Sequence, residues 1–154
     1  MTQTIDRLAE LGITLPAAPA PVASYVPARI EGSLAFVSGQ IPLLDGKLMQ
    51  TGSVPDQVSL DDAIACARQC GINALAAANE ALGSLDRVAG VVRVGVFVAC
   101  GAAFTDHPKV ANGASELFQQ VFGDAGRHAR AAVGSSSLPL GVPVEVEVTF
   151  AVRG

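Results

Sequence analysis

Two fully charged side chains stand in apolar runs near the C-terminus of the sequence. Arg130 enters the run ARAAVG, and Glu145 lies inside VPVEVEVTF. If the second run is a strand, its valines point to one face while Glu145, Glu147 and Thr149 point to the other. Such a carboxylate face can simply be solvated, which is the usual arrangement of charged groups. If several copies of the chain pack together, it can instead line clefts between subunits, where small ligands bind.

Other candidate nucleophiles are poorly placed for catalysis. The serines of GSSS lack the flanking glycine pattern of a nucleophile elbow. His107 and His128 are expected at the start of a helix and just before a strand, so no Ser-His-Asp triad is predicted. His128 can share a strand face with Arg130, because the two residues lie two positions apart. A purely structural role for His128 is the simpler alternative.

The three cysteines, Cys66, Cys70 and Cys100, are an odd number without secretory context, which is typical of reduced thiols in a cytosol. Cys66 and Cys70 are four positions apart and would share a helix face. No second pair of Cys or His follows at a spacing typical of zinc sites. We therefore expect all three to be core thiols, with a metal role as the remote alternative, and we expect no metal.

The composition favours burial between subunits and argues against a nucleic-acid partner. The chain has 154 residues, of which 50% are hydrophobic, enough for one compact core. Only 16% of the residues are charged, whereas about 25% is average for soluble domains. The net charge is −4 and the basic residues are scattered, so no basic surface for a nucleic-acid backbone is predicted.

The N-terminal segment is predicted to be a leader outside the main domain. TIDRLAEL has the pattern of a short amphipathic helix, and the prolines of LPAAPAPVAS favour an extended linker. No long apolar core of a signal peptide is present, and polar residues interrupt the apolar stretch 64–82, so no membrane span is expected. We predict a leader at residues 1–21, a single domain at residues 22–154 and a cytoplasmic location.

The order of predicted elements indicates an α+β fold. Residues 25–52 alternate short β-rich runs with turns at Glu31-Gly32 and Asp45-Gly46. A long helix capped by Ser59 or Asp61 runs to Gly83, and the strand VAGVVRVGVFVAC follows. A second helix ends at Gly123, and two more strands complete the chain. This order predicts one mixed sheet with both helices packed on one face, leaving the other face uncovered.

The sequence resembles the reactive intermediate deaminase family, also called YjgF or Rid and long described as endoribonucleases. The resemblance covers roughly residues 22–152. Its most specific parts are FVSGQIP at residues 36–42, ANGASELF at 111–118 and RAAVGSSSLPLGVPVEVE at 130–147. It implies a chorismate-mutase-like α+β fold, a homotrimer and three sites in the clefts between neighbouring subunits.

The resemblance also implies a chemistry, the hydrolysis of short-lived enamines and imines such as 2-aminoacrylate to 2-keto acids and ammonia. Arg130 matches the arginine that holds the substrate carboxylate, a task that suits a planar guanidinium. Glu145 matches the glutamate that orients a water and moves protons. No metal and no organic cofactor is implied, and the expected partners are a small carboxylate substrate and two further copies of the chain.

Four further residues match positions that line the site in this family. Tyr25 matches an aromatic residue that closes one side, although a tyrosine at a subunit contact is an equally good interpretation. Gly39 matches a glycine whose carbonyl faces the site. Asn112 matches a helix asparagine near the pocket, and a plain polar helix residue is the favoured alternative. Ala132 stands where many members have cysteine, so thiol-dependent reactivity is not expected.

Two other functions are compatible with the same residues. A trimer that keeps the arginine clamp but has lost turnover would bind small carboxylates or regulate other proteins. A ribonuclease is less favoured, because the chain is acidic, has no Trp and shows no basic groove with stacking aromatic residues.

Overall fold

The computed structural model describes residues 3–18 and 24–154, which form one sheet with helices on one side. The five-stranded sheet has the order β1-β2-β7-β5-β6, in which only the β5-β6 pair is parallel. Its strands are β1 (Ala28–Glu31), β2 (Leu34–Gln40), β5 (Val88–Ala99), β6 (Ala129–Ser135) and β7 (Val144–Val152). The helices are α1 (Thr4–Glu10), α2 (Leu60–Leu82) and α3 (His107–Phe122), with short 3₁₀ turns η1 (Leu85–Arg87), η2 (Gly123–Gly126) and η3 (Pro139–Gly141).

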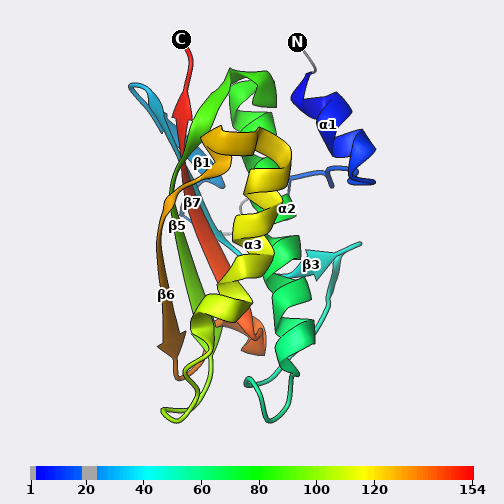
Figure 1. Ribbon diagram of the computed structural model, residues 1–154, viewed down its shortest axis with the longest axis vertical. Coiled ribbons are helices and arrows are strands. Elements are labelled where there is room, and N and C mark those ends of the chain that lie inside the picture. The colour runs from blue at the N-terminus through cyan, green and yellow to red at the C-terminus, as the bar shows by residue number, and fades with distance from the viewer. Residues whose placement is uncertain (1–2, 19–23) are drawn as a thin grey trace.

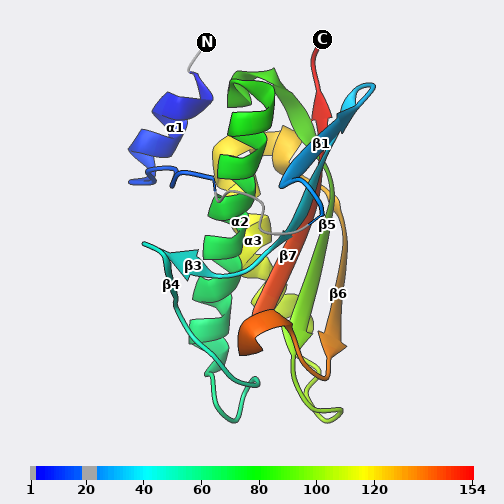
Figure 2. The ribbon, with the colours of Figure 1, turned by 180° about the vertical axis from the view of Figure 1, so that it is seen from behind.

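Helices α2 and α3 lie on the same face of the sheet, and none of the described helices covers the opposite face (Figures 1 and 2). This arrangement confirms the predicted α+β class, with a mixed sheet and both long helices on one face. The face without helices, called the open face below, exposes large apolar side chains. Phe36, Val92 and Val133 are each more than two-fifths exposed.

The central strand β7 separates apolar from polar side chains, as its sequence predicts. Val144, Val146, Val148 and Phe150 are buried beneath the helices. Glu145, Glu147 and Thr149 alternate with them and lie on the open face, only partly buried. Strand β5, on the far side of β7 from β2, is also largely buried, so the apolar core lies between this sheet and the two helices.

Both turns expected from glycine-containing pairs are present. Asp45 and Gly46 have φ values of 51° and 76° and join β3 (Leu43–Leu44) to β4 (Lys47–Leu48) in a small separate hairpin. Two successive residues with positive φ are typical of the tight turns that match strand twist. The turn between β1 and β2 contains Gly32, also at positive φ.

The long helix α2 begins and ends where its sequence indicates. The hydroxyl of Ser59 accepts a hydrogen bond from the amide of Asp62 at 3.1 Å, and Gly83 ends the helix in the left-handed region. Cys66 and Cys70 face the core, where burial raises the pKa of the Cys66 thiol to about 11. The expectation of core thiols is confirmed for these two, but it is wrong for Cys100, which lies at the rim of the core and is only half-buried.

The N-terminal helix packs on the domain through a few specific contacts. Leu8 is fully buried, and the amide of Thr4 donates to Asp86 Oδ1 at 2.7 Å. Arg7 Nε donates to the carbonyl of Gln120 at 2.8 Å. Residues 19–23 of the predicted linker lie outside the described residues. In the part of the chain that the structure describes, no helix is long and apolar enough to cross a bilayer.

Helices α2 and α3 approach each other closely at Gly113. A Cβ atom at this position would overlap the carbonyl oxygen of Ile64, which belongs to the backbone of α2. At Gly71, in the same interface, a Cβ would meet chiefly Leu117 Cδ2, at 2.8 Å, the end of a flexible side chain. The two glycines therefore tolerate an added methyl group to different degrees.

We expect Gly113→Ala to lower the free energy of unfolding by about 1–3 kcal/mol, the usual cost of overpacking against a part that cannot move aside. Gly71→Ala is the matched control and should cost less, because Leu117 can change rotamer. Urea denaturation of both variants measures the difference. Equal destabilisation of the two variants would show that the backbone of α2 at Ile64 moves aside as readily as the side chain of Leu117.

Candidate functional site

Arg130 lies on the helix side of the sheet. Its register partner on β5 is Val94, which is itself paired with Val148 on β7, and both valines are buried beneath the helices. Register partners point to the same face, so Arg130 is directed toward α3. Its Nη1 donates to Asn112 Oδ1 at 2.8 Å and to Ser115 Oγ at 3.0 Å. These contacts fix one end of the guanidinium, and the side chain as a whole remains exposed.

A chain of hydrogen bonds continues from Arg130 through Ser115 to His128. Ser115 Oγ lies 2.8 Å from His128 Nε2, and His128 Nδ1 lies 2.7 Å from the carbonyl oxygen of Gly126. A carbonyl can only accept, so Nδ1 carries the proton, and in the neutral ring Nε2 accepts from the hydroxyl of Ser115. Burial, and secondarily the charge of Arg130, lower the pKa of His128 and favour this neutral form.

Ser115 was not singled out from the sequence. It is buried, and it contacts both Arg130 and His128. Its role could have been inferred from the sequence, because Ser115 follows Asn112 by three residues and the two side chains therefore lie on one face of α3. His128 lies just before β6, and the common contact with Ser115 places it near Arg130, one of the two alternatives considered for this histidine.

Glu145 lies on the other side of the same sheet. It pairs in register with Phe97 of β5, whose other partner is Val133 of β6, an exposed residue of the open face. Its carboxylate lies over Gly39 of β2, where a Cβ atom would overlap Oε1. Glycine is therefore required at position 39 for this carboxylate to lie against the sheet. Burial first, and then the negative charge of Glu147, raise the pKa of Glu145.

Glu147 occupies an equivalent position over a second glycine but has a cationic partner. Its Oε1 would lie 2.8 Å from a Cβ at Gly95, and Arg93 Nη1 lies 3.5 Å from the same oxygen. Both side chains are about half exposed, so the ion pair contributes little to stability. No such cation is paired with Glu145 among the described residues, which makes it the better candidate for proton transfer.

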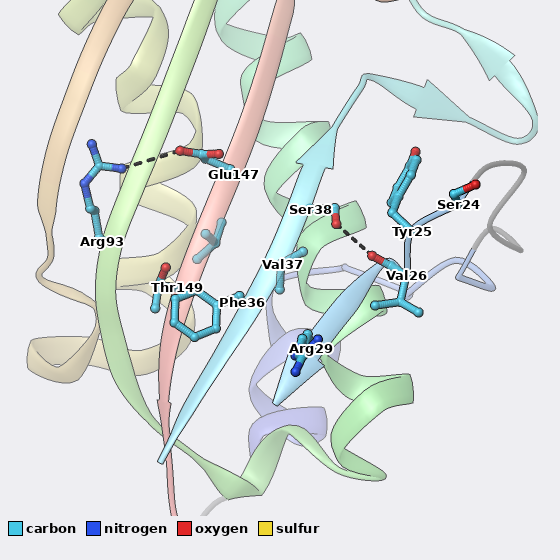
Figure 3. A pocket seen from close by; sticks show the side chains of 11 residues that line it. Ser24, Tyr25, Val26, Arg29, Phe36, Val37, Ser38, Arg93, Glu147 and Thr149 are labelled. Atoms are coloured by element: carbon cyan, nitrogen blue, oxygen red, sulfur yellow. Dashed lines mark hydrogen bonds and ion pairs between the residues drawn. The ribbon is translucent and has the colours of Figure 1, made fainter. Parts of the chain in front are cut away.

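A hollow of about 590 Å³ lies on the open face (Figure 3). Of the six predicted site residues only Tyr25 lines it, and this side chain is 56% exposed. The segment that contains Tyr25 and Val26 is held against β2, because Ser38 Oγ donates a hydrogen bond to the carbonyl of Val26 at 2.7 Å. The residues that line the hollow are Ser24, Tyr25, Val26, Arg29, Phe36, Val37, Ser38, Arg93, Glu147, Val148 and Thr149.

The six predicted residues thus fall into two groups, which we call the clamp half and the proton-transfer half. The clamp half contains Arg130, Asn112 and Ala132 on the helix side at the edge of the sheet, where Ala132 packs against the core. The proton-transfer half contains Glu145, Gly39 and Tyr25 on or beside the open face. The sheet separates the two halves within one chain, so a single chain does not bring them together.

The fold and the two half-sites define an α+β protein of the chorismate-mutase-like class. A family model described as "YjgF/chorismate_mutase-like, putative endoribonuclease" matches residues 5–151. The chain belongs to this family, which confirms the resemblance noted from its sequence motifs. Protein TCP17 of Trypanosoma cruzi is 45% identical over 142 residues, or 92% of this chain and 89% of that protein.

Two solved structures share the fold over nearly their full length. The protein Atu1372 of Agrobacterium tumefaciens, described as having unknown function, is 42% identical with a TM-score of 0.90, covering 97% of this chain and 93% of that one. A "putative endoribonuclease" from Shewanella oneidensis is 31% identical with a TM-score of 0.94, covering 98% and 100%. These names do not specify a substrate, so the activity has to be argued from the site.

The raised pKa of Glu145 predicts a pH-dependent effect on stability. The folded protein holds this proton more tightly than the unfolded chain does, so the stabilisation is present at low pH and is lost as the pH rises through the folded pKa. Glutamine at position 145 does not ionise, so the Glu145→Gln variant does not lose this stabilisation as the pH rises. We expect the variant to unfold at higher urea concentration than the wild type at about pH 7 and to lose that advantage near pH 3.5, where the carboxyl is protonated in both states.

Glu116→Gln is the control for this comparison, because Glu116 is exposed on α3 and its substitution removes the same charge without relieving burial. An equal shift in the two variants would show that net charge, rather than the environment of Glu145, causes the effect.

Proposed function

We propose that the protein hydrolyses reactive enamines and imines of the 2-aminoacrylate type to 2-keto acids and ammonia, in clefts between the subunits of a homotrimer. The observation that carries the proposal is the division of the candidate residues between the two sides of one sheet. Arg130 is positioned by Asn112 and Ser115, and Glu145 lies against Gly39. Within one chain neither half has the residues of the other half beside it. A neighbouring copy that covers the open face would bring its clamp half to the proton-transfer half of this chain.

The chemistry follows from the two halves. Two parallel N–H donors of Arg130 bind the substrate carboxylate, and the bonds to Asn112 and Ser115 hold the guanidinium in place. An enamine first becomes the imine by taking a proton from solvent on its terminal carbon and losing one from its nitrogen. Glu145 then accepts a proton from water as the water oxygen adds to the imine carbon, and returns it to the nitrogen. The hydroxyl proton of this tetrahedral intermediate moves to the nitrogen as the C–N bond breaks, so that ammonia leaves and the 2-keto acid remains.

The raised pKa of Glu145 suits this double role, because a general acid and base works best when its pKa is close to the operating pH. Position 39 also contributes, since any side chain there would displace the carboxylate from the sheet. Neither a redox step nor a group transfer is involved, so water is the only co-reactant of the reaction.

A ribonuclease activity is not proposed. The two cations that line the hollow of the open face both have acidic partners. Arg93 lies 3.5 Å from Glu147, and Arg29 lies 3.6 Å from Glu31. A groove that binds a polyanion presents clustered cations along the path of the phosphate backbone, whereas each of these two arginines lies beside an acidic residue. A trimer that binds 2-keto acids without turnover remains the second candidate, and it is an outcome of the assay below.

We expect keto acid and ammonia to be released from freshly generated 2-aminoacrylate, and the two charged residues to affect different kinetic constants. Arg130→Lys keeps the charge but loses the planar fork, so it should raise KM and also lower kcat. Glu145→Gln should lower kcat by about 10²–10⁴-fold while affinity for a 2-keto acid changes little. A wild-type rate equal to buffer with retained keto-acid binding would support the non-catalytic trimer. An unchanged kcat in Glu145→Gln would make Glu147 the next candidate.

Mixing two inactive variants tests the shared site directly. In a trimer that combines Arg130→Ala subunits with Glu145→Gln subunits, one of the three interfaces joins an intact arginine to an intact glutamate. Random mixing of equal amounts should therefore restore about one quarter of the wild-type activity. Co-expression with two affinity tags isolates the mixed trimers, and light scattering should give three times 15.6 kDa. No restored activity in isolated mixed trimers would place each site within one chain, and a monomeric mass would contradict the proposal as a whole.

A further inference from the structure

A thiol and an imidazole lie in contact where β5 and β6 end and α3 begins. These ends of the three elements lie at the lower end of the ribbon in Figure 1. Cys100 Sγ is 3.4 Å from His107 Nε2. The amide of Cys100 donates to the carbonyl of Ser135 at 3.1 Å, which ties its backbone to β6. His107 is the first residue of α3, and its ring packs edge-on against Phe104 with centroids 5.2 Å apart. The pair is therefore positioned from both sides.

The pair is reachable because the neighbouring position on β6 has no side chain. A Cβ atom at Gly134 would lie 2.9 Å from Cys100 Sγ and 2.9 Å from His107 Nε2. Gly134 is exposed, and both Cys100 and His107 are only half-buried. A small molecule can therefore approach the Cys100 sulfur across Gly134.

Gly134 also connects the pair to the clamp half. Arg130, Ala132 and Gly134 are alternate residues of β6 and pair with Val94, Val96 and Val98, all of which face the helices. The Cys100 thiol therefore lies at one end of a row that begins with Arg130, about 13 Å away along the strand. Position 132 itself supplies no thiol, and Cys100, which follows β5, approaches the same row from the neighbouring strand.

We propose that Cys100 and His107 form a nucleophilic pair that captures small carbon electrophiles, chiefly activated alkenes such as α,β-unsaturated carbonyl compounds. His107 Nε2 takes the thiol proton and Sγ attacks the terminal alkene carbon. The electron pair of the C=C bond moves to the carbon next to the carbonyl, and that carbon takes the proton from the imidazolium. One S–C bond forms, no group leaves, and no oxidant or reductant takes part.

The start of α3 lies next to the pair, because His107 is its first residue. Asp106 precedes the helix without a side-chain hydrogen bond to it and lies 3.4 Å from Lys109 as an ion pair. The first amide groups of this 16-residue helix carry a partial positive charge at the end where His107 lies. The imidazole of His107 remains the proton acceptor.

The other two cysteines are internal controls. Cys66 and Cys70 are fully buried. Burial raises the pKa of Cys66 to about 11 and that of Cys70 well above its usual value. In the folded protein both thiols should stay protonated and unreactive.

Peptide-resolved alkylation of the native protein tests the pair. The folded protein is treated with acrylamide or with iodoacetamide at neutral pH, and the modification of each cysteine is followed by mass spectrometry. With iodoacetamide the C–I bond breaks and iodide leaves. We expect Cys100 to react about tenfold faster than a cysteine in an unstructured peptide, whose thiolate fraction is only a few per cent. Cys66 and Cys70 should not react until urea unfolds the chain.

Two substitutions and a matched control separate chemistry from access. His107→Gln should reduce the rate at Cys100 to that of the peptide, and Gly134→Ala should slow it by covering the pair. Gly101→Ala adds the same methyl group where nothing beyond its two chain neighbours, Cys100 and Ala102, lies within 4 Å of the new Cβ, so it should leave the rate unchanged. The absence of alkylation at the buried Cys66 and Cys70 shows that each variant is folded. A Cys100 rate at or below that of the peptide, or no effect of His107→Gln, would overturn the proposal, and neither result depends on imine hydrolysis.

Discussion

The alternation of side chains along β7 is the constraint on which the rest of the structure depends. Because this strand is central, its buried valines and Phe150 must meet α2 and α3, and its acidic residues must then occupy the open face. A register shift of one residue would bury both glutamates under the helices, at the cost of removing two charged groups from water. The helices therefore cover only one face, and the acids and exposed apolar residues of the other face remain available for a neighbour.

Glycines on the adjacent strands make this carboxylate face possible. Gly39 on β2 and Gly95 on β5 leave room for Glu145 and Glu147 to lie against the sheet. The two acids are otherwise in different surroundings, since Arg93 pairs with Glu147, whereas burial and the charge of Glu147 raise the pKa of Glu145. One fold thus pairs one carboxylate with a cation and leaves the other partly buried without such a partner among the described residues.

The edge strand β6 has a different organisation, because its charged residue points toward the helices. Arg130 is satisfied there by Asn112 and Ser115 of α3, and His128 completes the network in its neutral form. A protonated His128 would place a second cation next to Arg130. The lowered pKa of this histidine therefore avoids a second positive charge beside the guanidinium.

Local features of this protein were determined by the sequence alone, because each depends on neighbours within a few residues. The Asp45-Gly46 turn, the Ser59 cap, the end of α2 at Gly83 and the two faces of β7 all follow from short patterns. The direction of Arg130 was decided only by the tertiary structure. The run ARAAVGS has small apolar residues at both alternating sets of positions, so its periodicity does not distinguish its faces. Pairing with β5 selects the face that Arg130 occupies. The same pairing brings Gly134 of β6 beside Cys100, which follows β5, and His107, which begins α3. A contact between residues of different elements leaves no periodic signal in the sequence.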